Sequence, residues 1–209
     1  MRPEEVEERF RAAGAFQEGH FELASGRHSP RYLEKFQVLQ WPAKTQELCA
    51  AIVERVRGLG VETVAGPTTG GIILAHEVAR QLGARAVYAE RAETGSGRVL
   101  RRGFRLGPGE RVLVVDDIMS TGGSVEETIA AVRYAGGQVA AVAVLVDRSG
   151  GAAVGSEVPH FALWEVAMET YEPASCPQCA AGVPLQRPGT TPAPATAGAA
   201  GGAGKKATP

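Results

Sequence analysis

The sequence lacks the features that mark secreted and membrane proteins. It has only three cysteines in 209 residues, Cys49, Cys176 and Cys179, an odd and sparse set that does not suit a disulfide framework. No apolar run approaches the roughly 18 residues needed to span a bilayer. The N-terminus, MRPEEVEERF, is charged rather than secretory. We therefore expect a reduced, cytoplasmic protein without a membrane partner.

The chain also lacks a net charge of either sign. Its 22 Lys and Arg residues nearly balance 23 Asp and Glu residues, giving a formal charge of −1. No overall basic field therefore favours a nucleic acid or an anionic membrane as a partner. Lysine is scarce, and almost all the cations inside the chain are arginines, whose planar fork suits phosphate and carboxylate ligands. Lysine occurs only at Lys35, Lys44, Lys205 and Lys206.

Large apolar residues are missing from the last segment, 188–209, which is rich in Pro, Gly, Ala and Thr. Such a segment cannot bury enough surface to order itself, so we expect a disordered tail. The remaining chain, 1–187, has enough hydrophobic residues for one sizeable domain. Its two ends, about 15–41 and 158–187, are expected to form a small hood.

Strand and helix patterns alternate in the middle of the chain. Apolar runs predict strands at 63–65, 86–89, 112–115 and 139–146, and helical patterns follow the first and third of them at 72–82 and 125–135. This alternation predicts an α/β fold with an open, mostly parallel sheet flanked by helices on both faces. In such sheets, ligands bind at the carboxyl ends of the strands.

The stretch VLVVDDIMSTGGS, 112–124, follows a buried strand with two acids and a loop of small residues. Burying Asp116 and Asp117 costs on the order of several kcal/mol unless they are paired, bound or at the solvent edge. We therefore expect them to bind sugar hydroxyls, although an Asp that merely caps the turn is the alternative. The loop Ser120–Ser124 would cradle a phosphate at a helix N-terminus, where Ser124 and Glu127 fit a capping box. A phosphate beside a diol describes a ribose 5-phosphate.

Two further strand ends carry unusual residues. The loop GPTTGG, 66–71, could bind a second phosphate through its backbone, or could be an ordinary turn. Asp147 and Arg148 follow the last predicted strand. The Arg148 fork could clamp a carboxylate or a ring carbonyl, or the two residues could form a surface pair.

The polar stretch 91–103 contains Arg91, Arg98, Arg101 and Arg102. This composition is typical of a mobile cationic loop that closes over an anionic substrate. A solvated β-hairpin explains the same stretch equally well.

The CxxC pair, Cys176 and Cys179, is most simply a plain turn. A structural zinc site needs four ligands, and Cys49 and His160 could complete a set only by chance of folding. His20 and His28 are expected to be solvated, although His28 could face a ligand.

The segment 112–124 resembles the phosphoribosyl pyrophosphate (PRPP) motif of type I phosphoribosyltransferases. GHFELASGRHSPRYLE, 19–34, and VLVDRSGG, 144–151, resemble segments of orotate phosphoribosyltransferases, and ETYEPASCPQCAAGVPL resembles a bacterial branch of them. The likeness covers about residues 1–189. It implies the type I phosphoribosyltransferase fold and a Mg²⁺-dependent reaction of de novo pyrimidine biosynthesis, in which PRPP and orotate give orotidine 5′-monophosphate and pyrophosphate.

The resemblance also implies roles for individual residues. Asp116 and Asp117 would hold the ribose hydroxyls, and Asp117 would also support the developing positive charge. Arg91 would reach pyrophosphate in the neighbouring subunit of a homodimer, and Ser120 and Arg148 would meet orotate. Mg²⁺ would be held mainly by substrate oxygens. The remaining PRPP-binding positions would be Thr68, Thr69, Gly70, Gly71, Ile118, Met119, Thr121, Gly122, Gly123 and Ser124.

The chain departs from the family pattern in its cations. Many family members have lysine at the positions of Ala24 and Gly70, and their catalytic loop carries lysines and a histidine. Arg98, Arg101 and Arg102 are the candidate substitutes. A purine or xanthine phosphoribosyltransferase is one alternative, which SGRHSPRYLE and DRSGG disfavour. A non-catalytic PRPP-binding regulator is another, which the missing lysines favour and the absence of an added helix-turn-helix segment disfavours.

Overall fold

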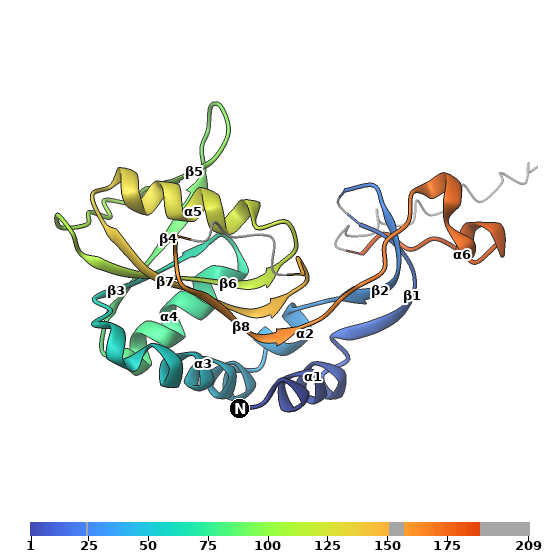
Figure 1. Ribbon diagram of the computed structural model, residues 1–209, viewed down its shortest axis with the longest axis horizontal. Coiled ribbons are helices and arrows are strands. Elements are labelled where there is room, and N and C mark those ends of the chain that lie inside the picture. The colour runs from blue at the N-terminus through green and yellow to red at the C-terminus, as the bar shows by residue number, and fades with distance from the viewer. Residues whose placement is uncertain (24, 151–156, 189–209) are drawn as a thin grey trace, which may run out of the picture.

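The computed structural model describes residues 1–23, 25–150 and 157–188 (Figure 1). Ala24 and the predicted tail beyond Pro188 lie outside the described residues, as does Gly151 at the end of the DRSGG motif. No helix in these three ranges is long and apolar enough to cross a membrane.

The chain forms one six-stranded sheet and one separate two-stranded hairpin. In the large sheet, β5 runs antiparallel to β4, and the other neighbouring strands are all parallel. The predicted α/β fold with a mostly parallel sheet is therefore confirmed. The strand order is β5 (Arg98–Leu100), β4 (Arg85–Arg91), β3 (Thr63–Pro67), β6 (Arg111–Met119), β7 (Gln138–Asp147) and β8 (His160–Glu165).

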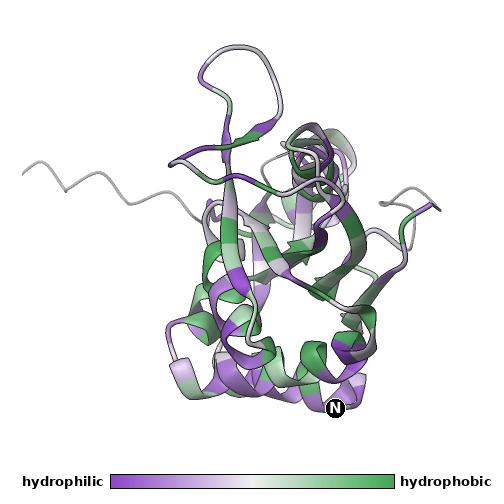
Figure 2. Ribbon diagram, turned by 90° about the vertical axis from the view of Figure 1, so that its left-hand side faces the viewer, coloured by the Kyte–Doolittle hydropathy of each residue, from purple (hydrophilic) through white to green (hydrophobic). Residues whose placement is uncertain are grey.

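Helices cover both faces of this sheet (Figure 1). On one face, α1 (Pro3–Ala12), α3 (Pro42–Val56) and α4 (Gly70–Leu82) bury an apolar cluster that includes Leu48, Ile52 and Leu74. On the other face, α5 (Gly123–Tyr134) packs Val125, Ile129 and Val132 against the strands. The short α2 (Phe36–Leu39) and the single turn η1 (Arg57–Leu59) precede and follow α3. The strands between these layers are predominantly hydrophobic (Figure 2).

Strand β6 lies at the centre of the sheet and determines where the acid pair is placed. Residues 112–115 are fully buried, as expected for a strand covered on both faces. The strand is longer than predicted and continues to Met119, so that Asp116 and Asp117 are its last buried polar residues rather than members of a loop. The two acids predicted to bind a ligand therefore belong to the last part of strand β6, not to the loop that follows it.

The predicted capping box of α5 is wrong. The N-cap residue is Gly122 in a left-handed conformation with φ 80°, and no side chain caps the helix. A glycine at this φ lets the chain enter the helix two residues before Ser124. The Glu127 carboxylate instead lies 3.4 Å from Nε of Arg98.

The N-terminal hairpin and the C-terminal segment form a separate unit, which we call the hood: β1 (Phe16–Glu22), β2 (His28–Leu33) and residues 166–188. The hood also contains the turn η2 (Pro173–Ser175) and α6 (Pro177–Ala180). Backbone bonds join its parts: His28 N–H donates to Tyr171 O at 2.9 Å and Gln186 N–H donates to His20 O at 2.7 Å. The hood lies to one side of the large sheet (Figure 1). Strand β8, within the span expected for the hood, is instead an edge strand of that sheet.

Candidate active site

The three loops singled out in the sequence meet at the carboxyl edge of neighbouring strands. Strand β6 lies between β3 and β7, so the loops after these strands are adjacent. The backbone N–H of Arg148 donates to Met119 O at 2.8 Å, which joins the ends of β7 and β6. The parallel strands therefore bring together loops that lie between residues 66 and 148 of the sequence. They meet at the carboxyl ends of the strands, where ligands bind in open sheets of this kind.

The acid pair is almost completely buried. Asp116 is 6% exposed and Asp117 is 3% exposed. Each carboxylate accepts one backbone N–H: Oδ1 of Asp116 from Asp117 at 2.8 Å, and Oδ1 of Asp117 from Ile118 at 2.7 Å. Burial, followed by the neighbouring Asp117 charge, raises the pKa of Asp116 to about 7, and burial also raises the pKa of Asp117. In both carboxylates the backbone bond uses Oδ1, so further acceptor positions can accept hydrogen bonds from a ligand.

A lysine that the sequence interpretation did not assign faces this pair. Nζ of Lys35 lies 3.3 Å from Oδ1 of Asp117. Lys35 follows strand β2 and immediately precedes α2, so the hood side of the molecule supplies this cation. Its charge partly offsets the effect of burial and lowers the pKa of Asp117. The scarcity of lysine was the one signal that could have drawn attention to it.

The loop after β3 approaches the acid pair so closely that it has no room for a side chain. A Cβ on Gly70 would lie 1.7 Å from Oδ2 of Asp117, and a Cβ on Gly66 would lie 2.2 Å from the Gly71 carbonyl oxygen. The Thr68–Thr69 peptide bond is cis. Gly70 therefore cannot carry the lysine that many family members have at this position without moving Asp117.

The loop after β6 surrounds a small cavity of about 60 Å³, lined by Asp116 and by residues 118–125. This volume is about two water molecules' share of the liquid, the right scale for a phosphate group. Ser120 and Thr121 are exposed at its rim, whereas the side chain of Met119 is buried in the core beneath α5. The backbone of this loop and its hydroxyl groups are thus the parts available to a ligand.

A larger cavity of about 750 Å³ adjoins this loop and contains Arg148. It is lined by Ser120 and Thr121 on the sheet side, and by Glu22, Leu23 and Ser25 on the hood side. Nε of Arg148 is buried without a hydrogen-bond partner among the residues that the structure describes. Burial lowers the pKa of Arg148. A buried, unpaired guanidinium donor suits an anionic or carbonyl ligand in this cavity.

Asp147 and Arg148 do not form the surface pair considered as an alternative. Asp147 is buried, and its Oδ1 accepts the backbone N–H of Ser149 at 2.6 Å. Asp147 therefore caps the turn after β7, which leaves the Arg148 side chain directed to the cavity.

The arginines of the stretch 91–103 lie on or near a hairpin made by β4 and β5. In the antiparallel register of these strands, the backbone of Arg91 lies opposite that of Arg98. Nη1 of Arg98 donates to Oγ1 of Thr68 and to the carbonyl of Ala89, both at 3.1 Å, so this buried arginine supports the loop after β3. Arg101 pairs with Glu93, and Arg102 pairs with Glu90 at 2.8 Å. Arg91 is exposed. Of these residues, the structure brings only Arg98 into contact with a predicted ligand loop.

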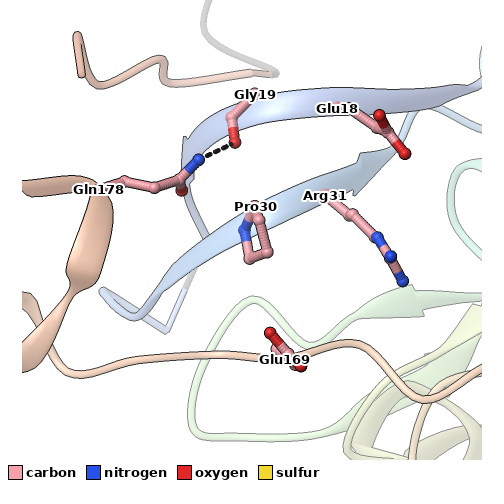
Figure 3. A pocket seen from close by; sticks show the side chains of 6 residues that line it. All are labelled: Glu18, Gly19, Pro30, Arg31, Glu169 and Gln178. Carbon is pink, nitrogen blue, oxygen red and sulfur yellow. Dashed lines mark hydrogen bonds between the residues drawn. The ribbon is translucent and has the colours of Figure 1, made fainter. Parts of the chain in front are cut away.

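A further cavity, of about 410 Å³, opens on the hood (Figure 3). It is lined by Glu18, Gly19, Pro30, Arg31, Glu169 and Gln178. None of these belongs to the three ligand loops, so this cavity is separate from the acid pair and carries no part of the candidate active site.

Comparison with known proteins identifies the family. The model of the phosphoribosyl transferase domain matches residues 36–169. An orotate phosphoribosyltransferase of Desulforamulus reducens is 50% identical over 91% of this chain and 98% of its own length, and one of Pelotomaculum thermopropionicum is 48% identical with the same coverage. The orotate phosphoribosyltransferase structure from Aeropyrum pernix has a TM-score of 0.67 at 26% identity, covering 77% of this chain and 93% of its own.

The fold alone is shared more widely. An adenine phosphoribosyltransferase from Thermoanaerobacter pseudethanolicus has a TM-score of 0.56 at 17% identity, covering 65% of this chain and 88% of its own. The fold alone therefore does not distinguish orotate from adenine phosphoribosyltransferases, whereas sequence identity over nearly the whole length does. The match to the phosphoribosyl transferase domain and the identity to these relatives show that the chain belongs to the orotate phosphoribosyltransferase family.

Proposed function

We propose that this chain transfers the 5-phosphoribosyl group of PRPP to orotate, giving orotidine 5′-monophosphate and pyrophosphate in pyrimidine biosynthesis. The observation that carries the proposal is the 750 Å³ cavity, which is lined by Arg148, a hydrogen-bond donor, together with Ser120 and Thr121 of the phosphate loop. An orotate carboxylate or ring carbonyl would satisfy that donor. A 5-phosphate in the neighbouring loop would then fix the distance between base and ribose.

The acid pair would bind the ribose. Asp116 and Asp117 each have oxygens that can accept hydrogen bonds from the 2- and 3-hydroxyls, which lie on the same face of a ribose ring. These bonds favour the ionised carboxylates, so substrate binding opposes the effect of burial on their pKa values. With Thr68, Thr69, Gly70 and Gly71 at the pyrophosphate, and Ser120–Ser124 at the 5-phosphate, PRPP would be held along its whole length.

Catalysis would depend mainly on placement and charge. The anomeric carbon becomes oxocarbenium-like as pyrophosphate leaves, and a fixed carboxylate close to it is worth more in a buried site than in water. The contacts of the Asp117 carboxylate with Lys35 and with the Ile118 N–H support this role, because they would hold the carboxylate in one orientation. Arg148 and Ser120 would hold the attacking nitrogen of orotate in line.

Mg²⁺, a homodimer and a cytoplasmic location complete the proposal. The buried acids and the small phosphate loops suit a Mg²⁺–PRPP complex held mainly through substrate oxygens. The ion would neutralise the pyrophosphate charge. Arg91 is exposed at the end of β4, which would allow it to reach the pyrophosphate of a neighbouring subunit.

Orotate consumption in purified protein tests the proposal. The ultraviolet loss of orotate is followed with PRPP and Mg²⁺, and hypoxanthine, xanthine and uracil are offered in parallel. We expect turnover of orotate alone, abolished by Asp117→Asn and retained by Glu126→Gln, which removes a charge from the exposed side of α5. Turnover of a purine would establish the alternative base. PRPP binding without turnover of any base would establish a non-catalytic regulator.

A further inference from the structure

Four metal-binding side chains meet inside the hood, away from the acid pair. They are His20 on β1, His28 at the start of β2, and Cys176 and Cys179 around α6, and their ligand atoms all lie within 4.8 Å of one another. His20 and His28 are 1% and 5% exposed, which corrects the expectation that both are solvated. The other cysteine, Cys49, is buried in α3 and takes no part, and neither does His160 on β8.

The hydrogen bond from His20 to Val183 fixes the tautomer of His20 and leaves its Nε2 lone pair facing the other three side chains. Nδ1 of His20 lies 2.8 Å from the Val183 carbonyl oxygen, which can only accept, so Nδ1 carries the proton. In the neutral ring, Nε2 then has a single lone pair. Three atoms surround it: Nδ1 of His28 at 3.0 Å, Sγ of Cys176 at 3.4 Å and Sγ of Cys179 at 3.7 Å. Nδ1 of His28, when it is unprotonated, and the two cysteine sulfurs can also each offer a lone pair, and a cation in the middle would satisfy all four groups.

Four of the six separations among these atoms lie close to the edges of a zinc tetrahedron. With Zn–N near 2.05 Å and Zn–S near 2.3 Å, a regular tetrahedron has N···N edges of about 3.3 Å and N···S edges of about 3.6 Å. The observed N···N separation is 3.0 Å, and Nδ1 of His28 lies 3.3 Å from Sγ of Cys179. The Val183 carbonyl supplies the outer hydrogen bond that zinc-bound histidines usually make.

The fold builds this cluster by specific means. The β1–β2 register shifts between Glu18 and Phe21, and a bulge of this kind re-aims side chains. His20 and Phe21 are consequently both buried although they are consecutive on a strand. On the other side, the Gln178 side chain, between the two cysteines, donates to the Gly19 carbonyl at 2.8 Å (Figure 3). The cysteine turn is thereby held against the strand that carries His20.

The part of the hood around these four side chains lies outside the two main apolar clusters of the protein. Phe21 and Cys176 are buried there, yet neither belongs to the two apolar clusters on the faces of the large sheet. Leu33 of β2 does belong to the larger cluster, so the hood is anchored to the sheet at that end. Where few apolar side chains are buried, a structural metal is a common means of holding a small region together. The cluster joins the first 30 residues to the last described ones, which is where such a link is most needed.

We propose that His20, His28, Cys176 and Cys179 bind one structural Zn²⁺ ion, with the two thiols as thiolates. All four ligands come from the protein, so the ion has no open position for a substrate. His20 and His28 flank the turn that contributes Glu22, Leu23 and Ser25 to the 750 Å³ cavity. The ion would therefore fix both ends of the turn that roofs the orotate site, a consequence that rests on the proposed function.

Metal analysis of the full chain, produced without a histidine tag in zinc-supplemented medium, tests the site directly. We expect about one zinc per chain after gel filtration. In Cys176→Ser/Cys179→Ser, the zinc content should fall below about a tenth of that value. Cys49→Ser is the matched control, since it removes the remaining cysteine outside the cluster, and it should retain the ion.

Cobalt substitution keeps the proposal testable where the double variant does not fold. Replacing zinc by Co²⁺ in the wild-type chain should give the intense visible bands of a tetrahedral ion with sulfur ligands. Wild-type protein that holds neither zinc nor Co²⁺ would overturn the proposal. So would iron in place of zinc, or a Cys176–Cys179 disulfide in the protein as purified. These readouts do not involve orotate, so they separate a failure of the zinc site from a failure of the proposed reaction.

Discussion

The ammonium group of Lys35 lies 3.3 Å from Oδ1 of Asp117, and the hood side of the molecule thereby supplies the cation that faces the acid pair. The Asp117 carboxylate is 4% exposed and the Lys35 side chain is 34% exposed, so the contact is partly screened by solvent on one side only. Besides this cation, the backbone N–H groups of Asp117 and Ile118 and the charge of Arg98 oppose the negative charge of the two adjacent buried carboxylates.

Lys35→Met should lower kcat/KM for PRPP by about 10- to 100-fold, the range typical of a lost charge-assisted contact. Because Lys35 lowers the pKa of Asp117, its removal should also move the acidic limb of the pH–rate profile to higher pH. Lys35→Arg should recover part of the rate. Lys44→Met removes the half-buried lysine of α3, whose ammonium lies 5.8 Å from the centre of the Trp41 ring, and should change neither quantity. An equal loss there would mean that net charge, not the contact between Lys35 and Asp117, matters.

Gly70→Ala should abolish tight PRPP binding while leaving the protein folded. The new Cβ would meet Oδ2 of Asp117 at 1.7 Å, and displacing that side chain costs about 1–3 kcal/mol, or roughly 10- to 100-fold in affinity. Gly58→Ala is the control, because a Cβ at Gly58 has no atom within 4 Å. Calorimetric PRPP titration of both variants measures the difference, and wild-type affinity in Gly70→Ala would show that the loop moves away freely.

Asp116→Asn should stabilise the protein without ligands, and more so at pH 8 than at pH 5. The folded-state pKa of Asp116 is raised to about 7. Between its ordinary value near 4 and about 7, the folded chain binds more protons than the unfolded chain, so stability falls as the pH rises. Asparagine keeps an acceptor for the Asp117 N–H and removes the buried charge. We expect a gain of about 1–3 kcal/mol at pH 8 in urea unfolding, and no such pH-dependent gain from Glu126→Gln.

Arg148→Lys should raise KM for orotate by about 10- to 100-fold and leave KM for PRPP nearly unchanged. Lysine keeps the charge but loses the planar fork, including the Nε donor that is unpaired in the described part of the chain. Arg133→Lys, on the last turn of α5, makes the same change outside the cavity. If both substrates lose affinity equally in Arg148→Lys, Arg148 supports the fold of the site and does not contact orotate.

Mixing two inactive variants tests the shared loop. If Arg91 acts in the partner's site, a dimer of one Arg91→Ala and one Asp117→Asn subunit has one complete site. Random exchange of subunits should then restore about a quarter of wild-type activity. If Arg91 acts within its own subunit, the mixture stays inactive at every ratio.

The sequence predicted the sheet well because its signals are local. The run 112–115 and the glycines after each helix determine strands, helix ends and ligand loops from neighbouring residues alone. Strand β8 was not predicted as a strand, because HFALWE is short and its partner strand β7 is needed to recognise it. The capping box failed because Gly122, rather than a side chain, sets the entry into α5.

The parts that could not be predicted depend on long-range contacts. Lys35 meets Asp117 only through the path of the chain from β2 into α2, which no periodicity reports. His20 and His28 are eight residues apart, unlike the shorter histidine spacing of common zinc motifs, and a bulge turns His20 inward. Their partners Cys176 and Cys179 follow about 150 residues later.

The hood is made from the two ends of the chain, and this determines when it can form. During synthesis, β1 and β2 leave the ribosome before the large sheet, whereas their partners Tyr171 and Gln186 emerge only after β8, the last strand of that sheet along the chain. The hydrogen bond from Nε of Arg27 to Oγ1 of Thr170, for example, joins residues that are 143 positions apart. Domains are completed in the order of their emergence, and closing a long loop costs entropy before any contact repays it. The sheet and its phosphate loops can therefore fold first, and the roof of the cavity can be completed only after them.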